Sequence, residues 1–149
     1  VRFITQVQSS PAVLPRRLAR IGEHMTLQVL PGEFSVCKVV DMAAVDFTAS
    51  WLFVGKTDAE LSVVCLREDA PQQYEAREDG WRAFRVAGQM DFSLTGVLAG
   101  LSAVLAQSGI SIFAVSTFDT DYVLVKQDRL AAALAALESA GYGLEVVSD

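Results

Sequence analysis

The C-terminal half of the chain carries the clearest pattern of apolar and polar positions. Residues 81–89 partly alternate between the two, which predicts a strand. Residues 110–117 and 121–126 are two further predicted strands, separated by a polar turn. Between the first and second strands, apolar residues recur at three- and four-residue spacing and predict a helix with one apolar stripe. That stripe consists of Leu94, Val97, Leu98, Leu101, Val104 and Leu105.

A second helix and a last strand complete this half. The segment 128–141 places Leu130, Leu134 and Leu137 on one stripe, and residues 144–147 form the closing strand. The predicted order is β-α-β-β-α-β, which is the ferredoxin-like arrangement of an α+β fold. Because crossover connections are right-handed, we expect both helices on one face of an antiparallel sheet.

The strand predicted over 110–117 is apolar on both faces. Ile110 and Ile112 point to one face, whereas Phe113 and Val115 point to the other. A strand that helices cover on one side only would alternate with polar residues. We therefore expect a second cover, supplied by the first half of the chain, by another subunit, or by both.

The first half has the pattern of a shortened copy of the second, a duplication inferred from the strand pattern alone. Residues 42–50 can hold a short helix, and the polar, proline-containing segment 68–80 is typical of a linker. The predicted strands are residues 27–30, 34–40, 51–57 and 61–67. The predicted organisation is a basic flexible tail over 1–24, a truncated subdomain over 25–70, a linker over 71–80 and a C-terminal domain over 81–149, against which the first half packs.

Composition narrows the classes of function. The 149 residues are 52% hydrophobic with a net charge of -6, which suits a packed core and argues against disorder. No basic patch lies outside residues 1–24, so no nucleic-acid partner is expected. No apolar run reaches the roughly 18 residues of a membrane span. Residues 1–24 are expected to be sequence that lies upstream of a translation start at Met25. The alternative is a basic targeting arm.

The cysteines and the histidine offer little chemistry. Cys37 and Cys65 lie inside strand-like runs without a partner at metal-ligand spacing, which favours buried free thiols in a reducing cytoplasm. His24 is the single histidine and lies in the tail. A catalytic triad or a histidine-bound metal site therefore has almost nothing to be built from.

Two polar loops are candidates for a binding site. Carboxylates in the loop 116–121 can receive an ammonium or guanidinium group, although Asp and Thr side chains also bond their own backbone in ordinary turns. The segment 91–96 begins a predicted helix, and the free backbone N–H groups at a helix start can bind a carboxylate. The alternative is an ordinary helix start whose N–H groups are capped by the chain itself. If both loops lie at one end of the sheet, together they would suit a zwitterion such as an amino acid.

A third candidate is the acidic set Glu75, Glu78 and Asp79. Such a set is more typical of a solvated linker than of a magnesium or calcium site, which needs better-organised oxygen ligands. No metal site is expected from it.

The segment DFSLTGVLAGLSAVLAQSGISIFAVSTFDTDYVLV, residues 91–125, resembles the ACT-domain proteins, which are small ligand-binding modules of ferredoxin-like fold. The likeness is to small bacterial proteins with two ACT-like units. These in turn are similar to the regulatory ACT pair of aspartate kinases and to animal cytosolic arginine sensors, which carry a similar Ser-Thr-Phe-x-x-Asp element. The resemblance covers roughly residues 26–147 and is densest over 81–126.

The resemblance implies that a ligand binds where the turn between the first strand and first helix meets an adjoining ACT unit. Matched by motif, the ligand-binding residues Thr95, Gly96 and Val97 would lie along the ligand backbone. Thr117 and Phe118 would form the wall of the pocket, and Asp121 would contact a basic group of the ligand. Asp119 departs from the pattern of the arginine sensors, so no role is assigned to it.

The function implied by this family is non-catalytic regulation through a bound amino acid, without a cofactor. Pairing of ACT units side by side would give a homodimer, and an enzyme would be the regulated partner. The alternative is a protein–protein adaptor with a vestigial pocket. An enzyme is the least favoured class, because the available carboxylates have no positioned partner.

Overall fold

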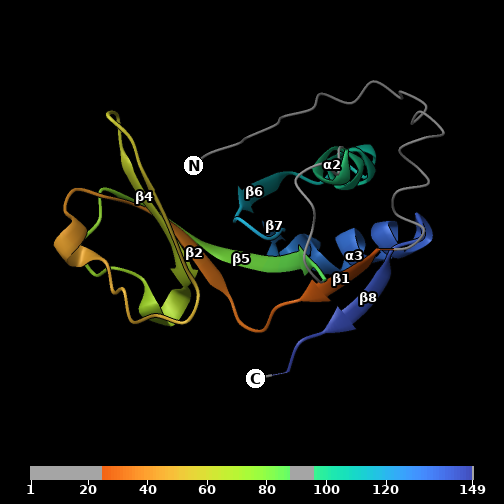
Figure 1. Cartoon of the computed structure of the whole chain (residues 1–149), viewed down its shortest axis with the longest axis horizontal. Helices are drawn as coiled ribbons and strands as arrows, with labels where there is room; N and C mark the ends of the chain where they lie inside the picture. The colour runs from red at the N-terminus through yellow and green to blue at the C-terminus, as the bar shows by residue number, and fades with distance from the viewer. Residues whose placement is uncertain (1–24, 88–95, 149) are drawn as a thin grey trace. The chain divides into compact units, whose positions relative to one another are not determined.

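The structure, a computed structural model, describes residues 25–87 and 96–148. The contact pattern divides the chain into two units, each considered by itself. The first unit is Gly32–Arg82, and the second unit consists of the described residues of 1–31 and of 83–149. The first unit is therefore inserted in the sequence of the second (Figure 1).

The second unit confirms the predicted β-α-β-β-α-β order. Its strands are adjacent in the order β6-β7-β5-β1-β8, which is the ferredoxin-like order with one extra strand. The elements are β1 (Thr26–Val29), β5 (Ala76–Val86), α2 (Val97–Gln107), β6 (Ile112–Ser116), β7 (Asp121–Lys126), α3 (Leu130–Ser139) and β8 (Gly143–Val146). Strand β5 is shared in the sequence: its residues up to Arg82 belong to the first unit, and those from Ala83 onward belong to the second. A short 3₁₀ turn, η4 (Gln127–Arg129), leads into α3.

Strand β1 lies between β5 and β8, which the sequence did not predict. Leu27 is opposite Val86 of β5 in an antiparallel pair and opposite Leu144 of β8 in a parallel pair. The sheet is therefore mixed, and the expected antiparallel sheet was wrong in this respect. The sequence pattern had grouped residues 27–30 with the first half because they are close in the chain, whereas their hydrogen bonds are made with the second unit.

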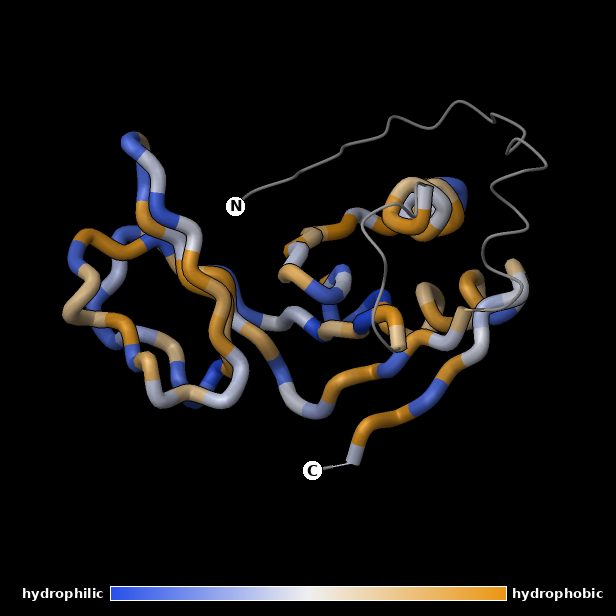
Figure 2. Tube along the Cα trace, in the orientation of Figure 1, coloured by the Kyte–Doolittle hydropathy of each residue, from blue (hydrophilic) through white to orange (hydrophobic). Residues whose placement is uncertain are grey.

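Both helices cover one face of this sheet, as expected. The predicted stripes of α2 and α3 lie in a single buried cluster with alternate residues of the strands, and α2 and β1 show the apolar colour in Figure 2. Leu94, the first residue of the predicted α2 stripe, lies outside the described residues. The members of the cluster include Leu27, Phe84, Val86, Val97, Leu101, Leu105, Ile112, Val123, Ala133 and Leu137.

Both faces of β6 are buried, as its double apolar pattern predicted. Ile112 belongs to the cluster under the helices, and Phe113, whose side chain points to the other face, is equally buried. The origin of the cover on that second face stays a prediction.

The first unit has strand order β3-β4-β2-β5, again the ferredoxin-like order. Its elements are β2 (Phe34–Val39), η2 (Met42–Ala44), β3 (Leu52–Lys56), β4 (Leu61–Leu66), η3 (Arg67–Asp69) and the first part of β5. The short helix expected over 42–50 is the single 3₁₀ turn η2. A second buried cluster, which contains Cys37, Val63 and Cys65, forms the core of this unit.

The segment expected as a linker over 71–80 contributes residues 76–80 to β5. Its polar side chains are compatible with a strand because β5 is the outer strand in the order of the first unit. The prediction that residues 25–70 and 81–149 are separate domains stays a proposal.

The two units repeat one another with an offset of 60 residues. Strands β3 and β4 begin at Leu52 and Leu61, and β6 and β7 begin at Ile112 and Asp121. The 3₁₀ turns that follow, η3 and η4, keep the same offset. The duplication that the strand pattern indicated is therefore present in the elements, with η2 in the place of helix α2.

Candidate functional site

The turn between β6 and β7 closes in only two residues. The Thr117 N–H donates to the Thr120 carbonyl at 2.9 Å, and the Thr117 hydroxyl donates to the same carbonyl at 3.2 Å. Phe118 and Asp119 form the tip, and the Phe118 side chain is 78% exposed. A threonine that bonds the backbone of its own turn is the alternative that the sequence left open, and the structure confirms it.

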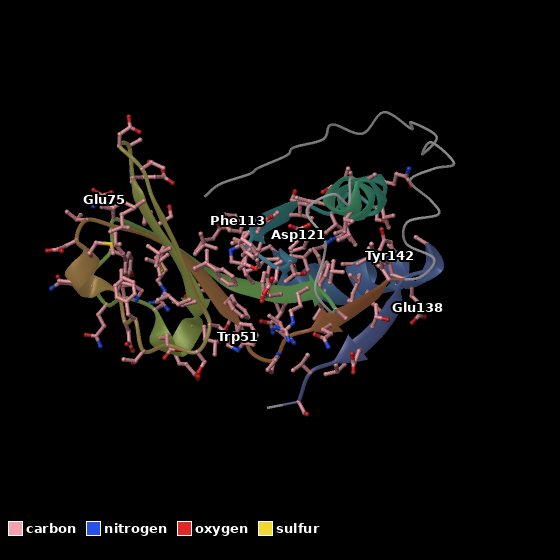
Figure 3. All side chains as sticks on the ribbon, in the orientation of Figure 1. Trp51, Glu75, Phe113, Asp121, Glu138 and Tyr142 are labelled. Atoms are coloured by element: carbon pink, nitrogen blue, oxygen red, sulfur yellow. The ribbon has the colours of Figure 1, made fainter. Side chains whose placement is uncertain are left out.

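Asp121 is held at the start of β7. The Ser116 hydroxyl donates to Asp121 Oδ1 at 2.6 Å, and the two residues are directly opposite in the β6–β7 pair. Asp121 is half-buried, and Figure 3 shows it on β7 beside β6. The Ser116 hydroxyl holds this carboxylate through Oδ1, and within residues 25–87 and 96–148 its second oxygen has no donor.

Thr120 joins this hairpin to the end of β5. Its side chain is buried, and its hydroxyl donates to the Val86 carbonyl at 3.0 Å. Val86 is the last residue of β5, so the chain leaves the sheet toward α2 beside the hairpin. Two loops therefore start from the same end of the sheet: the loop between β5 and α2, and the loop between β6 and β7. A shared binding site requires this arrangement.

The other implied residues are at the start of α2. Gly96 precedes the helix as its N-cap, with the left-handed backbone angle φ of 83° that favours glycine. Val97 is the first residue of α2 and is buried in the same cluster as Val86 and Val123. Thr95 lies outside the described residues.

The predicted site residues thus fall into two groups. The structure brings Thr117, Phe118 and Asp121 together on one hairpin, and places Gly96 and Val97 at the beginning of the helix that follows β5. The sequence did not predict the structural roles of Ser116 and Thr120, whose hydroxyl groups hold the hairpin in place. The available signal was a pair of hydroxyl residues at the ends of two apolar strand segments, one on each side of the turn.

Two residues of the third candidate, the acidic set, lie in a strand and not in a linker: Glu78 and Asp79 belong to β5, whereas Glu75 is exposed just before it. Asp79 is in β5 and accepts hydrogen bonds from the buried Ser35 hydroxyl at 2.5 Å and from Arg77 Nε at 2.7 Å. These two bonds, Ser35 first, lower the pKa of the Asp79 carboxyl. The expectation was wrong because alternating charged residues can also form an outer strand.

Cys37 and Cys65 are buried free thiols, as expected. Burial is the main cause that raises the pKa of both thiols, and it raises that of Cys65 to about 12. Both groups are therefore neutral and unreactive at physiological pH. Within residues 25–87 and 96–148, no set of three His, Cys, Asp or Glu residues is arranged to hold a metal ion. None of the helices described is long and apolar enough to cross a membrane.

Comparison of the sequence with known protein families gives a match over the second half of the chain. The family model described as "ACT domain" matches residues 76–139. The human protein named "Cytosolic arginine sensor for mTORC1 subunit 1" is 34% identical over 65 residues, which are 43% of this chain and 20% of the sensor. The chain therefore spans about a fifth of the length of the curated relatives it matches.

Solved structures give likenesses over most of the chain. A protein from Agobacterium tumefaciens is 30% identical, with a TM-score of 0.73 over 84% of this chain and 95% of that one. The regulatory subunit of aspartate kinase from Thermus thermophilus, in a ligand-free form, has a TM-score of 0.57 over 80% of this chain and 98% of that one. Its identity of 12% shows a shared fold alone.

Proposed function

This chain belongs to the ACT-domain family, and on that premise we propose that it is a non-catalytic regulatory protein that binds an amino acid. The proposed site lies at the edge where the β6–β7 hairpin adjoins the end of β5. The observation that carries the proposal is the bond from Thr120 to Val86, because it fixes an acidic hairpin beside the start of the connection to α2.

The roles of the residues follow from their chemistry. Asp121 offers a carboxylate oxygen to the ammonium or guanidinium group of a ligand, and Phe118 offers an apolar wall. Thr95, Gly96 and Val97 would receive the ligand backbone, as the family resemblance implies. Support comes from the curated relative, which is named as an arginine sensor.

A thermal-shift titration with the twenty amino acids tests this function. A ligand at about 100 times its dissociation constant should stabilise the protein by about 2.7 kcal/mol. Asp121→Asn should abolish most of the stabilisation by that ligand. Asp128→Asn, which removes an exposed carboxylate from η4, should retain it. A flat response to all twenty amino acids at millimolar concentration would refute amino-acid sensing.

The alternative function is a protein–protein adaptor with a vestigial pocket. It is favoured by the internal bonds of the hairpin, since Ser116 already occupies one oxygen of Asp121 and Thr117 bonds to its own turn. In that case Phe118→Ala would weaken capture of a partner protein and no amino acid would change the melting temperature. The two functions therefore give opposite results in the same titration.

We also propose a homodimer in which sheets of ACT units pair side by side, with an enzyme as the regulated partner and the cytoplasm as the compartment. In the described part of the second unit, β6 and β8 are the outer strands of the sheet and each has one edge for such pairing. The buried free thiols are compatible with a reducing compartment. Light scattering coupled to gel filtration measures the mass, and a monomer at all concentrations would refute the dimer.

A further inference from the structure

A cleft of about 480 Å³ opens in the first unit, beside the turn between β3 and β4. This volume is in the range of small-molecule sites, which is about 300–1,000 Å³. The end of β2, the start of η2 and the turn 57–60 line the cleft together with Glu75, which Figure 3 labels. All of these residues belong to the first unit.

The turn at this cleft repeats the turn of the candidate site. The Thr57 N–H donates to the Glu60 carbonyl at 2.9 Å, as Thr117 does to Thr120, and the Glu60 N–H donates to the Thr57 hydroxyl at 3.1 Å, as Thr120 does to Thr117 at 3.4 Å. Within its own unit, the cleft therefore has the position that the candidate site has in the second unit, beside the first strand and the hairpin.

The charges of the cleft are mixed, with acidic groups in excess. Lys38 is neutralised by Glu75, whose Oε2 is 3.4 Å from the ammonium nitrogen. Within the described residues, the Asp58 side chain makes no hydrogen bond or ion pair, and it is exposed at the turn. Asp41 and Glu60 each accept a hydrogen bond at one oxygen, from the Ala43 N–H and the Ser62 hydroxyl, and the other oxygen of each has no donor in the part of the chain that the structure describes. Lys56 is the remaining cation.

Apolar side chains alternate with these charges. Val40 lines the cleft and is 79% exposed, and Met42 and Leu61 lie beside it. A chain of methylene groups would cover this apolar surface, while the carboxylates on three separate segments would receive amino groups at its ends.

We propose that this cleft binds a small aliphatic amine of net positive charge, the class that includes diamines and basic amino acids. This site is additional to the proposed amino-acid site of the second unit and does not depend on it. Asp58 receives an amino group, Val40 and Met42 contact the methylene chain, and Lys56 receives the carboxylate when the ligand is an amino acid.

Residue-resolved NMR of the full chain, labelled with ¹⁵N, tests the proposal. The probes are 1,5-diaminopentane and L-lysine, with L-norleucine as the control that lacks the second amino group. We expect saturable shifts at residues 38–42 and 56–61 with the first two probes and not with norleucine. The separate signals of residues 116–121 report on the amino-acid site of the second unit, so failure of either site is recognised independently.

Variants identify the charges that matter. Asp58→Asn should weaken binding of both amines by about two- to five-fold, as expected for a partly exposed ion pair. Asp128→Asn, which removes an exposed carboxylate from η4 of the second unit, should leave binding at the cleft unchanged. Lys56→Gln should weaken binding of L-lysine, whose carboxylate loses its cation, and should not weaken binding of 1,5-diaminopentane, which has no carboxylate.

Three results would overturn the proposal. One is the absence of shifts at the cleft with either amine at millimolar concentration. Another is an equal response to norleucine, because the second amino group would then have no role. The third is an unchanged affinity in Asp58→Asn, which would leave the amine without its acidic partner.

Discussion

Thr120 is the residue on which the position of the candidate hairpin depends. Thr120→Val keeps the shape of the side chain and removes the hydroxyl that donates to the Val86 carbonyl. Because this bond is buried, we expect a loss of about 1–2 kcal/mol in the free energy of unfolding, measured by chemical denaturation. The ligand response of the hairpin should fall with it.

Thr48→Val is the matched control for this change. The Thr48 hydroxyl also makes a hydrogen bond, to Asp46 Oδ1 at 2.6 Å, but both residues are exposed. Water replaces the lost partner there, so the expected change is within about 0.5 kcal/mol. Equal losses in the two variants would contradict the role of buried Thr120.

At the scale of elements, the sequence predicts what local periodicity controls. The stripes of α2 and α3 and the strands on both sides of Thr117 follow from side-chain spacing alone. The place of β1 beside β8 could not be predicted, because an apolar alternation such as Leu27 and Val29 shows which face is buried and not which strand is the neighbour. The contact between Thr120 and Val86 likewise depends on tertiary structure, since the two residues are separated by 34 positions in the sequence.

Two glycines in turns allow the cost of backbone conformation to be separated from the cost of crowding. Gly32 and Gly109 have positive φ angles, 84° and 68°, so alanine is strained at both positions. A Cβ at Gly32 would lie 2.8 Å from Leu66 Cδ2, whereas a Cβ at Gly109 has no atom within 4 Å. Both turns therefore share the conformational cost, and only the turn that precedes β2 adds a steric one.

We expect Gly109→Ala to lower the free energy of unfolding by about 1–2 kcal/mol, which is the cost of the left-handed conformation. Gly32→Ala should lower it by a further 1 kcal/mol or so, because Leu66 has to move in a packed turn. Denaturant titrations of the two variants beside the parent measure the difference. A smaller loss at Gly32 than at Gly109 would show that Leu66 moves without cost.

At the scale of the whole molecule, the sequence of one unit interrupts the sequence of the other. The strand β1 precedes the first unit in the chain, yet it pairs with β5 and β8 of the second. A C-terminal fragment chosen from the sequence pattern, residues 81–149, therefore lacks the strand that lies between two of its own. The backbone groups of β5 and β8 that face β1 would lose their hydrogen bonds, and Phe84 and Val86 would lose the packing of Leu27 and Val29.

We accordingly expect the fragment 81–149 to be unfolded or aggregated, and a chain that restores β1 to fold cooperatively. The register suggests how to restore it, since the Leu30 N–H donates to the Ala83 carbonyl at 2.9 Å, so these residues are neighbours in the β1–β5 pair. Replacing residues 31–82 by Asn-Gly would join them through a two-residue hairpin loop. Circular dichroism and thermal unfolding compare this chain with the fragment 81–149. If both unfold at the same temperature with the same cooperativity, β1 is dispensable and residues 81–149 form a domain of their own.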